Sequence, residues 1–306
     1  MVIKIFCFPA LLVFLAACNP PGSKEGLFQI GRPLGVNRNE KLEEVSGLAA
    51  SVRYPGHLWT HNDSGHPAKL FLLDSLAQTS RVYRLSKIDN RDWEDITIGP
   101  GPEEGVTYIY IGDIGDNDEH YPFKYIYRFP EPSPAQGDLI DDFDTLVVRL
   151  SDAIRDTEAL MIDPITKNLY LVSKREQHVG LYEITFPFLE DTLTANRIAT
   201  LPVRHIVAAD ISRDGMEILL KNYDHIYYWK RSPGELLKNI LPTPPIKLPY
   251  DREMSGEAIA WSVDGSGFFT LGENGKGDRA PLLFYVRNKI TVKPNDSSAQ
   301  KVKSIP

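Results

Sequence analysis

The sequence contains very little cysteine. Cys7 and Cys18 are the only two cysteines among 306 residues. Cleavage of an N-terminal signal peptide would remove Cys7, and attachment of a lipid would modify the thiol of Cys18. The mature domain would then contain no disulfide, thiolate metal site or cysteine nucleophile. Such a domain depends on its own hydrophobic core for stability.

The sequence also lacks a long basic run. It has 34 Lys and Arg against 41 Asp and Glu, a net charge of −7. Nucleic-acid binding needs clustered positive charge, so we expect no nucleic-acid partner. Beyond the apolar residues 5–15, no stretch is long and apolar enough to span a bilayer. No segment has a sustained 3.6-residue apolar period, which argues against a helical array.

The first residues are typical of an exported lipoprotein. Residues 1–4 carry one positive charge, residues 5–15 are apolar, and Leu15-Ala16-Ala17-Cys18 resembles a bacterial lipobox. We expect residues 1–18 to be a lipoprotein signal peptide with Cys18 lipidated, and residues 19–27 to be a tether. An ordinary signal peptide with a chance cysteine is the alternative. The lipobox predicts a location in the bacterial cell envelope, anchored to a membrane on the periplasmic or outer-membrane side.

What the sequence does contain is a weak internal repeat. The copies are Val45-Ser46-Gly47-Leu48, Trp93-Glu94-Asp95-Ile96, Thr157-Glu158-Ala159-Leu160, Ala208-Ala209-Asp210-Ile211 and Gly256-Glu257-Ala258-Ile259. The second residues are separated by 48 (46 to 94), 64 (94 to 158), 51 (158 to 209) and 48 (209 to 257) positions. Repeats of about 40–50 residues are typical of propeller blades or helical arrays.

Short strands rich in aromatic and β-branched residues follow each copy, bounded by Gly, Asn, Asp or Pro. They predict an all-β, five-bladed β-propeller with four-stranded blades, formed as a single domain by residues 28–306. Phe28-Gln29-Ile30 is expected to supply an outer strand that closes the ring. The 64-residue interval is interpreted as an insertion within residues 113–120 and 130–142. A concealed sixth blade, giving a six-bladed propeller, is the alternative.

The innermost strands of a propeller line its axis, so the repeated acidic residues should converge there. Three carboxylates in a narrow channel must take up protons or bind a cation. Oxygen donors without Cys or His suit a hard cation, and Ca²⁺ accepts irregular geometry better than Mg²⁺. The alternative is that these glutamates cap backbone N–H groups or pair with Arg91 and Arg155.

The repeat copies resemble calcium-activated nucleotidases (apyrases), which are five-bladed propellers with an axial Ca²⁺ held by serine and glutamate. The resemblance covers residues 43–269 through short matches and extends to Leu58-Trp59-Thr60-His61-Asn62-Asp63-Ser64-Gly65. It implies Ser46, Glu94, Glu158 and Glu257 as metal ligands. Ala209 stands where those nucleotidases have serine, and Asp210 is the alternative ligand from that repeat. The segments WTHNDSG, DWED and GDIGDN also resemble a group of bacterial envelope propellers.

Polar residues after the second strand of each repeat are expected to form a ligand-binding ring beside the axis. These residues are Asp63, Asp113, Asp116, Asn117, Lys174, Arg175, Lys221 and Glu273. Their mixed charge could bind an anion such as a phosphate ester. The alternative is that they are solvated hairpin tips, in which Asp and Asn serve turn geometry.

Two functions follow from these features. The favoured one is a lipid-anchored envelope propeller with an axial Ca²⁺ that binds a small anionic ligand or another envelope protein. The second is a metal-dependent hydrolase of phosphate esters or nucleotides, similar to apyrases. No nucleophile elbow, P-loop or zinc signature is present, so no catalytic residue is assigned.

Overall fold

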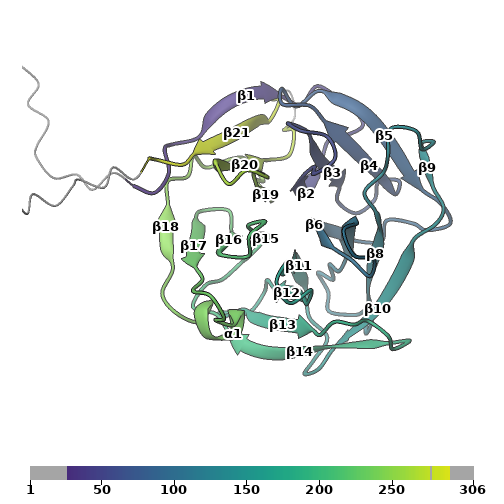
Figure 1. Ribbon diagram of the computed structural model, residues 1–306, viewed down its shortest axis with the longest axis vertical. Coiled ribbons are helices and arrows are strands. Elements are labelled where there is room, and N and C mark those ends of the chain that lie inside the picture. Colours follow the sequence, from purple (N-terminus) through teal and green to yellow (C-terminus); the bar gives the residue numbers. More distant parts are fainter. Residues whose placement is uncertain (1–25, 276–277, 290–306) are drawn as a thin grey trace, which may run out of the picture.

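The protein is built almost entirely of β-strands arranged around a central axis, as in a propeller (Figure 1). The computed structural model describes residues 26–275 and 278–289. The expected signal peptide and Cys18 lie outside these residues. The helix α1 (Leu237–Ile240) is a single turn. Within the described ranges no helix could cross a bilayer, because none combines the length and the apolar character that this requires.

The strands form four hydrogen-bonded sheets. The first contains β2 (Val45–Ala50), β3 (Leu58–Asn62), β4 (Lys69–Leu73), β5 (Thr79–Leu85) and β9 (Leu139–Ile140). The second contains β6 (Trp93–Pro100), β7 (Thr107–Asp113), β8 (Lys124–Pro130), β10 (Asp144–Leu150), β14 (Leu193–Thr200), β13 (Gly180–Ile184), β12 (Leu169–Ser173) and β11 (Thr157–Ile162). The third contains β15 (Ala208–Ile211), β16 (Glu217–Lys221), β17 (Ile226–Lys230) and β18 (Ile246–Leu248). The fourth contains β19 (Ala258–Trp261), β20 (Gly267–Leu271), β21 (Pro281–Val286) and β1 (Arg32–Val36).

The eight-stranded sheet consists of two antiparallel halves joined at their outer strands. Strands β10 and β14 pair in parallel, with Val148 opposite Leu193. The segment between β8 and β10 lies within the 64-residue interval and also crosses to a neighbouring sheet, because β9 pairs in parallel with β5. Glu131 fixes this crossing: its carboxylate accepts hydrogen bonds from Trp59 Nε1 at 2.9 Å and from Ser51 Oγ at 2.5 Å.

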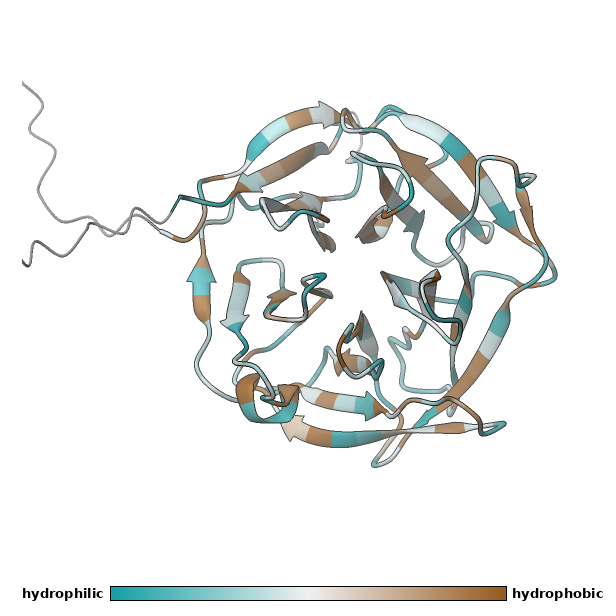
Figure 2. Cartoon of the chain, viewed as in Figure 1, coloured by the Kyte–Doolittle hydropathy of each residue, from teal (hydrophilic) through white to brown (hydrophobic). Residues whose placement is uncertain are grey.

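Five strands lie closest to the axis and pack side by side in a ring, in the order β2, β6, β11, β15 and β19, with β19 next to β2 (Figure 1). Both faces of each sheet are covered by neighbours. Every residue of β2 and β11 is therefore buried, whereas β10 and β14 include half-buried and exposed positions. Figure 2 shows that the outer strands carry a mixture of hydrophilic and hydrophobic residues. The consecutive apolar residues of the repeat copies have this physical origin.

The two ends of the described chain meet in the fourth sheet. Strand β1 pairs antiparallel with β21, with Arg32 opposite Phe284. The expected closing strand Phe28-Gln29-Ile30 is displaced along the chain: Phe28 makes only an isolated bridge with Arg287, and the outer strand is β1. The aromatic ring of Phe28 is instead buried against Trp261 and Phe268, where it serves the core.

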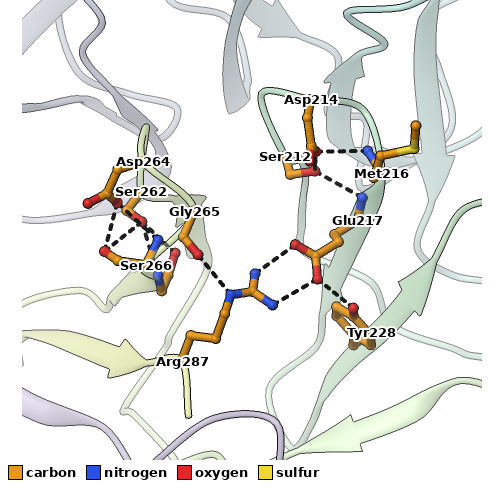
Figure 3. Close-up of polar contacts among 11 residues, drawn as sticks. Ser212, Asp214, Met216, Glu217, Tyr228, Ser262, Asp264, Gly265, Ser266 and Arg287 are labelled. Carbon is orange, nitrogen blue, oxygen red and sulfur yellow. Dashed lines mark hydrogen bonds and ion pairs between the residues drawn. The ribbon is translucent and has the colours of Figure 1, made fainter. Parts of the chain in front are cut away.

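Arg287 also joins the fourth sheet to the third (Figure 3). Its guanidinium donates to both carboxylate oxygens of Glu217, at 2.9 and 2.6 Å, and its Nε donates to the carbonyl oxygen of Gly265 at 2.8 Å. Tyr228 donates a further hydrogen bond to Glu217. Bidentate pairing of this kind fixes orientation as well as adding energy.

Replacing Arg287 with Ala should lower the free energy of unfolding by about 2 kcal/mol, because the bidentate pair and the contact with the Phe28 ring are lost together. Chemical denaturation measures this. Arg252→Ala is the control, because the Arg252–Asp224 pair is solvent-exposed (side chains 71% and 55%). It should change stability by no more than about 0.5 kcal/mol. Equal losses in the two variants would contradict a closing role for Arg287.

Candidate metal centre

Carboxylates from three segments gather where the inner strands begin. One oxygen each from Asp63, Asp92 and Glu94 lie within 4.8 Å of one another, and so do oxygens from Glu94, Asp156 and Glu158. The two groups share Glu94. We call these five residues the acidic centre. It unites two of the expected metal ligands, Glu94 and Glu158, with Asp63 of the expected loop ring.

A repeated irregularity in strand pairing accounts for this convergence. The register of β2 with β3 shifts between Val45 and Gly47, and the same shift occurs around Glu94 in β6 and Glu158 in β11. The repeated residues Ser46, Glu94 and Glu158 are therefore bulge residues. A bulge turns a side chain out of the regular alternation and is common beside functional sites. Strand β15 pairs with β16 without such a shift, and Ala209 occupies its matching position.

The acidic centre is strongly unfavourable for ionised carboxylates without a cation. Burial raises the pKa of Glu94 well above its usual range, and the charges of Glu158, Asp63 and Asp92 raise it further. Burial also raises the pKa of Glu158 to about 8. Burial likewise raises the pKa of Asp63 to about 6. The centre must therefore hold protons or attract positive charge.

One lysine reaches the acidic centre directly. Lys174 Nζ lies 2.8 Å from Glu158 Oε1. Burial opposes the charged lysine, but the Glu158 carboxylate outweighs it and raises the Lys174 pKa. Arg175 pairs with Asp156, the Nε to Oδ2 distance being 2.6 Å. Five carboxylates thus face two cations, which leaves an excess of negative charge.

The other expected metal ligands make different contacts. Ser46 Oγ donates to the main-chain oxygen of Glu94 at 2.5 Å and lies 3.5 Å from Glu94 Oε2, so Ser46 borders the acidic centre. Glu257 precedes β19 and accepts a hydrogen bond from Tyr223. Asp210 is not part of the acidic centre. Its oxygens accept hydrogen bonds from the backbone N–H groups of Ile211 at 2.8 Å and Trp261 at 2.7 Å.

Most of the expected loop ring is engaged in internal pairs. Asp113 pairs with Arg91 at 3.1 Å. Asp116 accepts two backbone hydrogen bonds, each of 2.8 Å, and lies 3.4 Å from Lys124. Lys221 is fully buried and pairs with Glu253 at 3.6 Å. These side chains hold loops in place, so they do not form one open basin.

The two remaining ring residues differ in how they reach the centre. Asn117 accepts a hydrogen bond from Arg175 and so touches the centre only through that arginine. Glu273 lies farther out; burial raises its pKa to about 7, with contributions from Glu257, Glu44 and Asp63.

Sequence analysis missed Asp92 and Asp156. Each stands two residues before a repeated glutamate, and Glu44 stands two residues before Ser46. An acidic residue two positions before the inner repeat residue, in three of the copies, could therefore have identified Asp92 and Asp156 from the sequence. Glu253 and Tyr223, which surround Lys221 and Glu257, had no comparable repeat signal.

The residues present fit a hard cation. All donors of the acidic centre are oxygen atoms, and the centre carries excess negative charge. The loop after β7 closes over it: a Cβ added to Gly115 would lie 2.1 Å from Glu94 Oε1 and 2.5 Å from Asp92 Oδ2. Only glycine allows this close approach of the main chain.

Comparisons with known proteins support the fold. No protein-family model matches the chain, and no curated protein matches it. A PQQ-bound aldose sugar dehydrogenase from Streptomyces coelicolor is similar in structure, with 12% identity and a TM-score of 0.50 over 86% of this chain and 98% of that chain. A gluconolactonase from Xanthomonas campestris (13%, TM-score 0.45, 79% and 72%) and the Dos1 propeller (13%, TM-score 0.39, 80% and 68%) are more distant.

At such identities the likeness indicates a β-propeller fold and nothing about activity. None of the three is a nucleotidase. The nucleotidase resemblance therefore rests on the sequence motifs alone.

The metal-free protein should lose stability as pH rises from 6 to 8.5. Glu158 has a model-compound pKa of 4.5 and a folded pKa of about 8, so the folded state retains a proton that the unfolded chain releases. Its stabilising contribution is complete below pH 4.5 and is lost as pH rises through 8. Thermal melting in chelator across this range measures the slope, and Glu158→Gln should flatten it. A melting temperature that rises from pH 6 to 8.5 would contradict the prediction.

Proposed function

We propose that this protein is a calcium-dependent binding propeller. The observation that carries the proposal is the acidic centre, in which two groups of buried or half-buried carboxylates share Glu94 and two of the members, Glu94 and Glu158, stand at bulges. A divalent cation there would offset the burial and the mutual repulsion that raise the pKa of Glu94. Asp63, Asp92 and Glu94 would hold it, with Asp156 and Glu158 beside them.

Calcium is favoured over other cations by the donor set. Ca²⁺ takes six to eight oxygen ligands in flexible geometry, whereas Mg²⁺ demands a near-ideal octahedron and retains water. The donors here are carboxylates from separate strands and loops, with no imidazole or thiolate among them. Zinc and copper prefer nitrogen and sulfur donors.

The acidic centre also offers a place for an anionic ligand. Lys174 stands at its edge and is partly exposed. An anion that completes the coordination of calcium would find this ammonium group next to it. The ligand would be a small anionic molecule or an acidic side chain of another envelope protein.

We further propose that the ring has five blades. The support is the ring of β2, β6, β11, β15 and β19 around the axis. The eight-stranded sheet would then be two blades joined by the parallel contact of β10 with β14. Under this interpretation each repeat copy begins one blade.

Calcium should raise the melting temperature of the metal-stripped protein, because it binds the folded state. At a free calcium concentration of 100 times Kd the gain is about 2.7 kcal/mol. Glu94→Gln should abolish most of this gain, since Glu94 belongs to both carboxylate groups. The same substitution should leave the metal-free protein as stable as wild type or more so, because it removes a repelling charge. Differential scanning calorimetry with and without chelator measures both effects.

The matched control is Glu190→Gln, a change of equal chemistry at an exposed position outside the repeat copies. It should retain the full calcium effect. If calcium leaves the wild-type melting curve unchanged and no metal copurifies, the calcium proposal fails. If Glu94→Gln destabilises the metal-free protein by more than about 2 kcal/mol, the carboxylate is structural and the repulsion argument fails.

A second candidate is a metal-dependent phosphate-ester or nucleotide hydrolase. The observation in its favour is that Lys174 and the acidic centre adjoin, as a phosphate-binding cation and metal would. Incubating the calcium-loaded samples with ATP separates the two functions. Release of phosphate that is lost in Glu94→Gln would favour the hydrolase, and binding without turnover would favour the binding propeller.

We also propose that the protein is lipid-anchored at Cys18 in the bacterial envelope, on sequence grounds alone. Cys18→Ser should block lipid attachment and leave the protein either unprocessed or released from membranes. Metabolic labelling with a fatty acid and membrane fractionation measure this. Normal processing together with wild-type membrane association would show that the anchor lies elsewhere.

A further inference from the structure

A cavity, which we call the axial cavity, lies at the opposite end of the axis from the acidic centre. It has a volume of about 300 Å³ and is lined by residues of all five inner strands. They include Ala50, Ile98, Ile162, Asp210 and Trp261. Ala50, Ile98, Ile162 and Trp261 lie toward the ends of their strands, whereas Glu94 and Glu158 lie near the beginnings. The two sites are therefore separated along the axis.

The axial cavity adjoins another cavity of about 360 Å³, which we call the outer cavity. Ala50, Val52, Ser262 and Val263 line both. The outer cavity extends over the aromatic rings of Phe269 and Phe284, between the first and fourth sheets. The two cavities thus form an elongated cleft, which we call the far-end cleft.

The walls of the outer cavity are mainly apolar. The axial cavity has both polar and apolar walls, and Asp210 is the acidic group among its lining residues. Its oxygens each accept one backbone hydrogen bond, from Ile211 and from Trp261, and a carboxylate oxygen can accept a second. The residue as a whole is half-buried. Arg213, the other charged group lining this cavity, is exposed to solvent. A ligand that enters the cavity therefore meets a carboxylate in its wall.

We propose that the far-end cleft binds an elongated, mainly apolar molecule whose protonated amine contacts Asp210. The apolar part would extend past Val263 over Phe269 and Phe284. Burial of that part supplies affinity. The charge-assisted hydrogen bond to Asp210 supplies the preference for an amine head.

The buried environment of Asp210 is consistent with this preference. Burial raises the pKa of Asp210 to about 7, and the backbone hydrogen bonds from Trp261 and Ile211 oppose that increase. A bound ammonium group would hold the carboxyl group ionised. This site is independent of the proposed calcium function, because none of the acidic-centre carboxylates lines either cavity.

Three probes of equal length test the proposal at pH 8: 4-phenylbutylamine, 4-phenylbutan-1-ol and 4-phenylbutyrate. The amine should bind about tenfold more tightly than the alcohol, and the carboxylate more weakly than either. Calorimetry, or ligand-observed nuclear magnetic resonance for weak binding, measures the affinities. Asp210→Asn should bring the amine to the affinity of the alcohol. Chelator should leave the affinities unchanged.

Val263→Trp tests the elongated shape, because a larger side chain at the shared wall would narrow the passage between the cavities. It should weaken binding of 4-phenylbutylamine at least fivefold. Leu189→Trp is the matched control at an exposed position outside the cleft and should bind as wild type does. Equal affinity for amine and alcohol in wild type, tighter binding of the carboxylate, or equal binding by Val263→Trp and Leu189→Trp would each overturn the proposal. If Asp210→Asn does not fold, the three probes on wild type still decide the head group.

Discussion

The open inner edges of the strands around the axis are the constraint on which this structure depends. The innermost strand of each sheet has no partner on its axial side, so backbone groups there need side-chain partners or water. Asp95 accepts the N–H groups of Leu160 at 2.9 Å and Ala209 at 3.3 Å, in β11 and β15. Asp210 does the same for Trp261 in β19. Carboxylates on the axis are therefore needed for the fold before any ligand is considered.

This need separates two kinds of axial carboxylate. Asp95 is fully buried and already accepts three backbone hydrogen bonds, the third from Ile96. Glu94, its neighbour in sequence, borders other carboxylates and is displaced toward them by the bulge in β6. Asp95 accepts hydrogen bonds from main-chain N–H groups, whereas Glu94 is not needed for that purpose. Surplus buried charge is a mark of functional sites, because it costs stability unless a ligand offsets it.

The sequence predicted the β-propeller fold from the spacing of the repeat, and it brought Glu94 and Glu158 together correctly. The outer contacts were not predictable in the same way. The parallel pairs β10–β14 and β9–β5 join segments that no local pattern connects, and β1 took the closing place expected for Phe28-Gln29-Ile30. The loop ring was overestimated because similar sequence offsets do not fix side-chain direction. Lys221 is an example: its sequence position matches the expected ring, but its side chain is fully buried beside Glu253.

The same five strands give the two ends of the axis opposite chemistry. Strand β6 carries Glu94 and Asp95 near its start and Ile98 toward its end, and β11 carries Glu158 near its start and ends at Ile162. These two strands thus carry their charge near the start and apolar residues toward the end, whereas β2 and β19 contain no charged residue. Strand β15 begins with two alanines and carries Asp210 at the repeat position of Asp95 in β6. Ala209 therefore leaves no carboxylate at the position of Glu94 and Glu158, and Asp210 lines the far-end cleft. The missing carboxylate at one end comes from this alanine, while Asp210 keeps the role that Asp95 has, accepting a backbone N–H group of the neighbouring inner strand.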